Sequence, residues 1–260
     1  MGNNIKLSVV IITFNEESNI KRCLESVKNI ADEIVIVDSY SMDKTKEIAE
    51  GYQLRWIEHP FAGHIEQKNY ALQQASNNYV LSLDADECLS DELLIEVKKI
   101  KSDCQYDSYV FNRLTNYCGK WIRHCGWYPD RKLRLWNKNK GAWGGVNPHD
   151  MVLMQEGCTT YRINKDILHY SYNSITDHLK QVNYFTDIGA KEAVEKGKKS
   201  SIIHILLSPA IKFTKSYFFQ LGFLDGYYGF IVSVISAQAS FYKYLKMQEL
   251  YKKNSKRQSI

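Results

Sequence analysis

Short β-branched runs alternate with segments of helical period along the first hundred residues, and this alternation limits the possible folds most. Leu7–Thr13 and Glu33–Asp38 are continuous apolar runs, typical of strands that are covered on both faces. Between them, Ile20, Leu24 and Val27 recur at helical spacing. The rhythm predicts right-handed βαβ crossovers, and hence an α/β fold with a Rossmann-like, mostly parallel sheet and flanking helices.

The alternation continues to about residue 101. We expect further helices over about 43–50, 64–75 and 91–101, and strands over 54–58 and 79–83. In doubly wound sheets, ligands bind at the carboxyl ends of the strands. The side chains that follow these strands are therefore the first candidates for a functional site.

Acidic and polar side chains stand at three of these strand ends. Thr13, Asn15 and Glu16 close the first strand and could contact a nucleoside, and Asp38 closes the second and could accept from a base NH or a ribose hydroxyl. Each has a simpler reading, because such residues also start helices and cap turns. Lys68, on the helix before the next strand, could reach a bound donor or lie on a solvated helix face.

Asp84 and Asp86 follow the third strand end at positions i and i+2, so both carboxylates can face one ligand. Mg2+ and Mn2+ bind through one or two carboxylates, with substrate phosphate oxygens and water completing the shell. The pattern predicts a divalent metal site that holds a diphosphate. The alternative reading is an exposed turn before the helix that starts near Asp91.

The regular alternation of strand-like and helix-like segments ends at about residue 105. Strand-like pieces are separated by Gly-, Trp- and Tyr-rich linkers, and we expect residues 141–150 to form a Gly-rich loop. Arg131 and Arg134 could bind phosphate or belong to a half-exposed strand. The predicted domains are a catalytic domain over 1–173, with a nucleotide-sugar half (1–105) and an acceptor half (106–173), and a helical region over 174–260.

The helical region is unusually apolar, over Ser201–Ile211 and Tyr217–Tyr242, and basic residues flank it. The second run is long enough to span a bilayer, but Asp225 would be costly there. Basic residues beside aromatic ones favour peripheral attachment to an anionic membrane. Packing against the catalytic domain or a second subunit, as in a homodimer, and a true span are the alternatives.

Composition excludes several classes of protein. The six cysteines stand singly, without the spacing of a zinc site, and a net charge of +5 is too small to indicate a nucleic-acid partner. The N-terminus lacks the pattern of a secretory signal, so we expect the active part to be cytoplasmic.

Taken in order, these segments resemble family 2 glycosyltransferases. The resemblance rests on Ser8–Glu16, Asp38–Ser41, Gln67–Ala71 and Val80–Glu87. It is closest to the branch that builds lipopolysaccharide core, which Tyr128–Trp136 and Gly222–Gly226 also fit. It implies a GT-A fold, a nucleotide-sugar donor, a lipopolysaccharide-core, glycolipid or oligosaccharide acceptor, and an inverting displacement assisted by Mg2+ or Mn2+.

The resemblance also implies residue roles. The nucleotide-sugar contacts would be Thr13, Asn15, Glu16, Asp38, Lys68, Asp84 and Asp86, with Asp86 as the principal metal ligand. An inverting transfer needs a base, for which Asp150 is the candidate, with His149 as a metal or phosphate contact. Because Asn147-Pro148 interrupts the pattern of this branch, both could instead belong to a structural loop.

The sequence favours addition of a single sugar, because the Gln-x-x-Arg-Trp pattern of processive synthases is missing after the base. Two other functions stay open. A sugar nucleotidyltransferase would need a Gly-rich, Arg-containing loop after the first strand, where this chain has Thr13–Glu17. A catalytically silent, membrane-associated scaffold would keep the fold without the activity.

Overall fold

The computed structural model describes residues 3–146 and 149–258, without the side chains of His149 and of residues 255–258. The chain divides into two compact units. The first consists of residues 1–114 and 130–170, and the second of residues 115–129 and 171–260. The predicted division at residue 173 stays a prediction.

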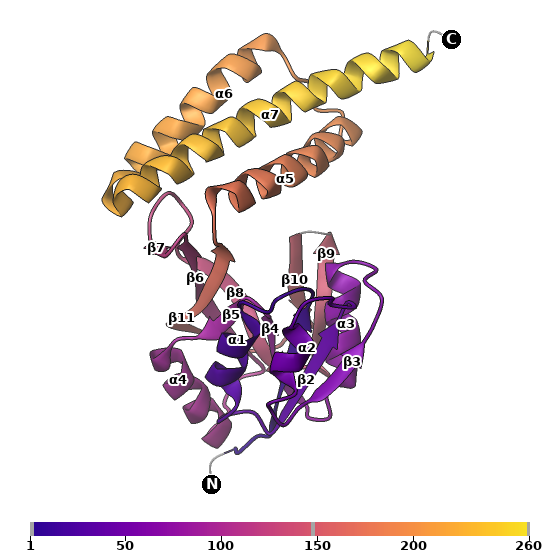
Figure 1. The fold of residues 1–260 in the computed structure, drawn as a ribbon, viewed down its shortest axis with the longest axis vertical. Helices are drawn as coiled ribbons and strands as arrows, with labels where there is room; N and C mark the ends of the chain where they lie inside the picture. The colour runs from indigo at the N-terminus through magenta and orange to yellow at the C-terminus, as the bar shows by residue number, and fades with distance from the viewer. Residues whose placement is uncertain (1–2, 147–148, 259–260) are drawn as a thin grey trace. The chain divides into compact units, whose positions relative to one another are not determined.

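The first unit is built on one mixed sheet (Figure 1). Its strand order is β3-β2-β1-β4-β8-β6-β11-β5. The elements are β1 (Leu7–Thr13), α1 (Ile20–Val27), β2 (Glu33–Asp38), α2 (Thr45–Ala49), β3 (Arg55–Glu58), α3 (His64–Gln74), β4 (Tyr79–Asp84), β5 (Glu87–Leu89), α4 (Asp91–Ser102), β6 (Ser108–Tyr117), β8 (Asp130–Asn137), β9 (Gly141–Val146), β10 (His149–Met154) and β11 (Thr160–Tyr172). The predicted α/β class is confirmed.

Parallel pairing joins the first four strands. β1 lies between β2 and β4 and pairs with both in parallel, whereas β8 pairs antiparallel with β4 and β6. Helices join β1 to β2, β2 to β3 and β3 to β4, as parallel neighbours require. The sheet is therefore parallel where the sequence alternates regularly between strand and helix. Beyond it the sheet is mixed, since β6 and β11 run in the same direction, with Ser108 hydrogen-bonded to Thr159 and Cys118 to Tyr172.

Helices cover both faces of the parallel part. On one face α1 and α4 contribute Leu24 and Leu93 to a core with Val9 of β1, and on the other α3 contributes Ala71 to a core with Val10. Successive strand residues thus point to opposite faces, both of them apolar. This explains why the strands read as continuous β-branched runs.

The register brings the predicted strand ends together. Thr13 stands beside Asp38, and Ile12 stands beside Asp84. The three polar strand ends are consequently neighbours at one edge of the sheet.

The expectation of a Gly-rich loop over residues 141–150 is wrong for its described part. Gly141–Val146 and His149–Met154 form the antiparallel pair β9 and β10, with Trp143 opposite Val152. Trp143 is buried against Trp136 of β8, which anchors the pair. The apolar residues between the glycines and the hydrogen bonds between β9 and β10 stabilise a strand here. The glycine content had instead indicated a loop.

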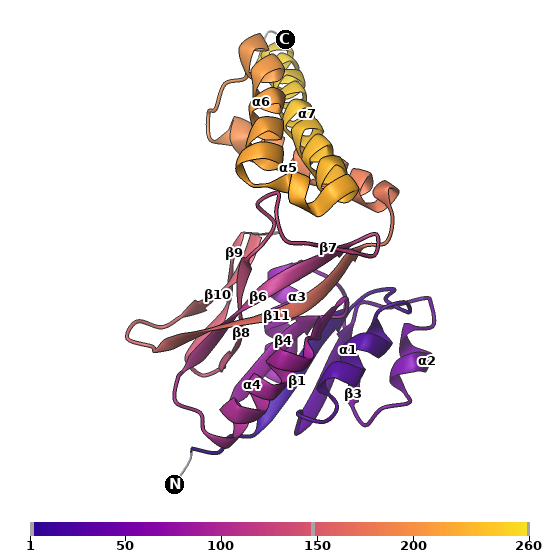
Figure 2. The same cartoon turned by 90° about the vertical axis from the view of Figure 1, so that its left-hand side faces the viewer.

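The second unit is helical, apart from the short strand β7 (Lys120–Ile122), which pairs with the end of β6. It contains α5 (Ile175–Glu195), α6 (Ile202–Thr214), the π-helix η1 (Lys215–Phe219), the 3-10 helix η2 (Gly222–Asp225) and α7 (Gly226–Gln258). α7 packs against both α5 and α6 (Figure 2). The Ser174 side chain caps the start of α5.

The predicted apolar run Tyr217–Tyr242 is not one helix. The chain bends at Leu221, whose φ of 55° lies in the left-handed region. Among the described residues no single helix is long and apolar enough to span a bilayer, although the bent pair Ile202–Phe219 and Gly222–Asn254, at 69°, meets that test of length and composition together.

Candidate active site

The loops after β1 and β2 are tied together by side chains. Asp38 is buried, and its carboxylate accepts from the Ser41 amide at 2.8 Å. The Asn15 amide donates to Ser41 Oγ, and the Met42 amide donates to Asn15 Oδ1, each at 2.8 Å. The capped-turn reading of Asp38 is therefore correct. It leaves the nucleoside contact predicted for Asp38 and Asn15 as a prediction.

Glu16 and Thr13 carry polar atoms at the same sheet edge. Burial raises the pKa of Glu16 to about 7, against a hydrogen bond from Asn19 and with support from the nearby carboxylate of Asp86. Thr13 Oγ1 is buried without a hydrogen-bond partner among the described residues. Both groups are thus placed to gain from a polar or cationic ligand.

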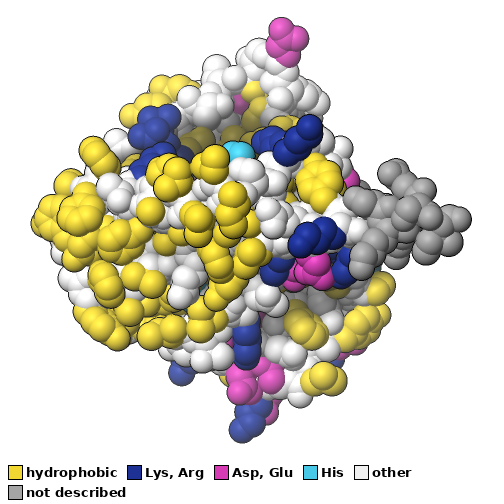
Figure 3. All heavy atoms as spheres, turned by 90° about the horizontal axis from the view of Figure 1, so that it is seen from above, with side chains coloured by type: hydrophobic (Ala, Val, Ile, Leu, Met, Phe, Trp, Pro, Cys, Tyr) yellow, Lys and Arg dark blue, Asp and Glu magenta, His cyan; other side chains and the backbone are white. Residues whose placement is uncertain are grey.

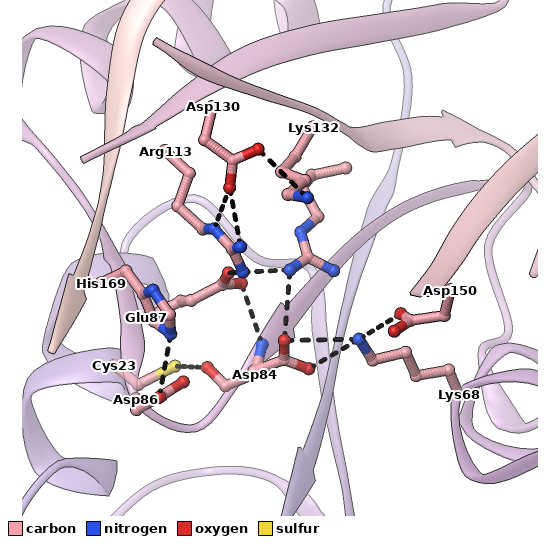
Figure 4. A network of polar contacts seen from close by, with 11 residues as sticks. Cys23, Lys68, Asp84, Asp86, Glu87, Arg113, Asp130, Lys132, Asp150 and His169 are labelled. Atoms are coloured by element: carbon pink, nitrogen blue, oxygen red, sulfur yellow. Dashed lines mark hydrogen bonds and ion pairs between the residues drawn. The ribbon is translucent and has the colours of Figure 1, made fainter. Parts of the chain in front are cut away.

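Asp84 lies between two cations (Figure 4). Lys68 Nζ is 3.1 Å from Asp84 Oδ1, and Arg134 Nη2 is 3.1 Å from Asp84 Oδ2. Burial alone would raise the pKa of Asp84, but Lys68 and Arg134 outweigh it and hold that pKa well below its usual range. Asp84 is therefore ionised throughout the physiological range.

The cations around Asp84 are held by further carboxylates. Arg134 Nη2 also lies 2.7 Å from Glu87 Oε1, and both side chains are buried, with 3% and 0% exposed. Arg113 bridges Glu87 and Asp130. Arg134 is thus paired with carboxylates of its own chain. Arg131, three residues earlier on the same strand, is exposed, as predicted for a half-exposed strand.

Lys68 connects the sheet edge to β10. Its side chain is 4% exposed, and Nζ lies 2.7 Å from Asp150 Oδ2 and 4.5 Å from the centroid of the Trp143 ring. The solvated-face reading of Lys68 is therefore wrong. Asp150, predicted as base, is joined to Asp84 through a single ammonium group.

The residues beside Lys68 hold the pieces in place. Asn69 forms two hydrogen bonds with the backbone of Trp143, at 2.8 and 3.0 Å, as a neighbouring strand would. Gln67 is buried and donates to Ser39 Oγ at 3.0 Å. This segment of α3 thus fixes the loop after β2, the centre of the site and β9.

Asp86 has a partner that the sequence analysis missed. His169 Nε2, on β11, lies 3.1 Å from Asp86 Oδ2, and His169 Nδ1 is buried without a hydrogen bond among the described residues. The turn Asp84–Glu87 between β4 and β5 brings the two together, because β5 pairs with β11 through Glu87 and His169. Sequence spacing gave no signal for this contact, since 83 residues separate the pair.

The Asp86 and His169 pair could provide two of the ligands of a divalent cation. It offers one carboxylate and one imidazole, both partly exposed, and the described residues hold no group of three or more metal-ligating side chains. Mg2+ and Mn2+ sites that bind phosphates commonly use few protein ligands, and the substrate completes the shell. The predicted metal contact of His149 falls on a side chain outside the described residues, as does the Asn147-Pro148 interruption.

The chain is similar to several known proteins. A family model described as glycosyl transferase family 2 matches residues 8–158. A protein of Rickettsia bellii, named an uncharacterized glycosyltransferase, is 34% identical over 259 residues, which cover 94% of this chain and 87% of the relative. The lipopolysaccharide core biosynthesis glycosyltransferase LpsC of Rhizobium meliloti is 28% identical over 264 residues, covering 96% and 94%.

A solved structure shares the fold. The mannosyltransferase PcManGT of Pyrobaculum calidifontis, solved in complex with GDP-Man and Mn2+, aligns with a TM-score of 0.54 at 13% identity, over 94% of this chain and 87% of that one. At this identity the similarity shows the fold alone, and it agrees with the predicted GT-A class.

Proposed function

The chain belongs to glycosyltransferase family 2, and from this membership we propose that it is an inverting enzyme that transfers one sugar from a nucleotide-sugar to a saccharide acceptor. The proposed donor is a UDP-sugar, and the proposed acceptor is a lipopolysaccharide core or another glycolipid. The similarity to the lipopolysaccharide core biosynthesis glycosyltransferase of Rhizobium meliloti supports this acceptor class.

One observation carries the proposal. The buried ammonium of Lys68 contacts both Asp84, at the strand edge where ligands of such sheets bind, and Asp150, on the neighbouring hairpin. A donor-binding carboxylate and a base that acts on the acceptor must lie within one site. Lys68 connects these two carboxylates, because its ammonium contacts both Asp84 and Asp150.

The strand ends would bind the donor. Asp38, held by its turn, would accept from the base or the ribose. Thr13 Oγ1, which has no hydrogen-bond partner within the described part of the chain, would bind a donor hydroxyl, and the ionised Asp84 would accept from another. Asp86 and His169 would hold Mg2+ or Mn2+ with the diphosphate. The ion would supply Lewis-acid stabilisation of the charge on the leaving diphosphate.

Asp150 would act as the base. Its carboxylate takes the proton of the acceptor hydroxyl while that oxygen attacks the anomeric carbon on the face opposite the diphosphate, and the bond to the diphosphate oxygen breaks. The Lys68 ammonium contacts the Asp150 carboxylate that would accept this proton. We therefore propose that donor phosphate oxygens compete for Lys68 and release Asp150, so that the donor binds before the base becomes active.

The test replaces the base while keeping its shape. Asp150→Asn should lower kcat by about 10²-fold to 10⁴-fold, with a much smaller change in the KM for the donor. The exposed Glu156→Gln is the control and should retain activity. Transfer is measured with a panel of UDP-, GDP-, ADP- and CMP-sugars, and NMR gives the anomeric configuration of the product. Retained configuration, or full activity of Asp150→Asn, would contradict the mechanism.

We also propose that the enzyme works as a peripheral protein at the inner face of the cytoplasmic membrane, where a lipid-linked acceptor would be presented. The apolar and basic composition of the second unit supports this location.

A further inference from the structure

The bend between α6 and α7 carries a concentration of exposed apolar side chains. Figure 3 shows hydrophobic side chains gathered over this bend. We call the following residues the apolar face: Ile203, Leu207, Ile211, Phe218, Phe219 and Leu224. Leu207 is 55% exposed and Phe219 is 80% exposed. Soluble proteins rarely expose a contiguous patch of this kind unless it binds something.

The face follows from the helical repeat. Ile203, Leu207 and Ile211 are spaced by four residues and so lie along one side of α6, while Ile205, between them, is buried on the other side. The bend at Leu221 connects η1 to η2, and Gln220 is the one polar side chain in the sequence between Phe219 and Leu224. α6 is therefore apolar on its packed side and on its open side.

Only cations accompany the apolar face. Lys198, Lys199, Lys212 and Lys215 are exposed. From residue 196 to residue 248 the single acidic residue is Asp225, which is buried and accepts hydrogen bonds from the amides of residues 123 and 124. The surface is thus apolar and positively charged, with no exposed carboxylate along this stretch.

We propose that the apolar face inserts shallowly into an anionic lipid surface, with Lys212 and Lys215 at the level of the headgroups. Exposed apolar residues beside lysines are the composition of helices that lie in the membrane interface. A span through the bilayer would place both lysines in hydrocarbon, which is costly. A symmetric contact between two copies would bring like-charged lysines together, whereas anionic lipid complements them. The inference specifies the surface for the proposed membrane location and does not depend on glycosyl transfer.

The experiment measures flotation of the full chain with vesicles of phosphatidylcholine, with and without phosphatidylglycerol. The wild type should bind the anionic vesicles, and more weakly as salt rises. Lys212→Glu with Lys215→Glu should weaken binding by at least about 25-fold, from about fivefold for each lysine removed. Leu207→Glu with Phe219→Glu should weaken it by more than about tenfold, because charged residues replace inserted apolar ones.

Ile95→Glu is the matched control, because Ile95 is 53% exposed on α4 of the first unit. It should bind like the wild type. Failure of the wild type to bind anionic vesicles, or equal binding by Ile95→Glu and Leu207→Glu with Phe219→Glu, would overturn the inference. The inference would also be overturned if light scattering showed a dimer that dissociates in the double variant Leu207→Glu with Phe219→Glu, since a second copy would then cover the apolar face. None of these readouts needs a nucleotide-sugar, so their failure is distinct from failure of the proposed activity.

Discussion

At the scale of single residues, the two aspartates of the Asp-x-Asp segment differ in what surrounds them. Asp84 is fixed between Lys68 and Arg134, whereas Asp86 pairs with the imidazole of His169 and lies near the carboxylate of Glu16. A cation that approached Asp84 would have to displace two positive charges. We therefore propose Asp86 as the carboxylate that binds the metal, and Asp84 as the one that is held ionised to orient a ligand.

Arg134→Met tests the buried ion pairs. The substitution leaves the carboxylates of Glu87 and Asp84 without their shared guanidinium, so the free energy of unfolding at pH 7 should fall by about 3–5 kcal/mol. Arg131→Met, on the same strand but exposed, should change it by less than about 0.5 kcal/mol. Urea denaturation measures both. Equal stability of the two variants would show that Arg134 does not stabilise the carboxylates.

Glu16 predicts a pH dependence of stability. Its pKa of about 7 in the folded chain exceeds the ordinary value of 4.5, so between these pH values the unfolded chain releases the proton first and wild-type stability falls as pH rises. Glu16→Gln cannot ionise. It should therefore match the wild type near pH 4 and be more stable by about 1–3 kcal/mol at pH 8. Urea denaturation across this range checks the difference, and a difference that is independent of pH would refute it.

At the scale of elements, α3 is the part that assembles the site. Gln67 contacts the loop after β2, and Lys68 contacts the carboxylates of Asp84 and Asp150. Asn69 contacts the backbone of β9. The position of Asp150 on β10 consequently depends on how α3 holds β9. Local sequence indicated a helix with one useful cation, and the structure shows three successive side chains with separate contacts.

Asn69→Ala tests this dependence. It removes both hydrogen bonds to the Trp143 backbone and should lower the free energy of unfolding by about 1–3 kcal/mol. It should also speed hydrogen exchange of the Trp143 amide, because the hairpin that bears Asp150 loses its support. For the same reason, kcat should fall by a larger factor than the factor by which the KM for the donor changes. Gln73→Ala, on the same helix but exposed, is the control. Unchanged exchange at Trp143 would rule out the proposed role of Asn69.

The first half of the fold could be predicted from sequence because its signals are local. β1, β2 and β4 are apolar runs followed by polar side chains, and parallel pairing places their ends together. The contacts made by Arg134 and His169 could not be predicted, since they arise from antiparallel pairing between strands that are far apart in sequence. The β9 and β10 pair was missed for a different reason: its glycines resemble a loop, and burial of Trp143 overrides them.

At the scale of the whole molecule, the two units carry different chemistry. The first has a balanced network of carboxylates and cations around one sheet edge, and the second has an apolar face accompanied by lysines. Sequence composition was sufficient to predict the apolar and basic character of the second unit. It could not show that the apolar run is divided by a bend, because that depends on the backbone at Leu221.

We propose that Asp86, with His169, holds a divalent cation that binds the donor diphosphate. The most direct measurement is the melting temperature with UDP, with and without Mn2+, for the wild type, Asp86→Asn and the control Glu156→Gln. A ligand at about 100 times its Kd stabilises the folded chain by about 2.7 kcal/mol, which corresponds to a rise of about 5–10 °C for a chain of this size.

We predict that UDP with Mn2+ raises the melting temperature of the wild type and of Glu156→Gln by this amount, and that neither UDP nor Mn2+ alone does so. Asp86→Asn should show no such rise, because the cation loses its carboxylate ligand. A rise in Asp86→Asn equal to that of the wild type, or a rise in the wild type that needs no metal, would contradict the account.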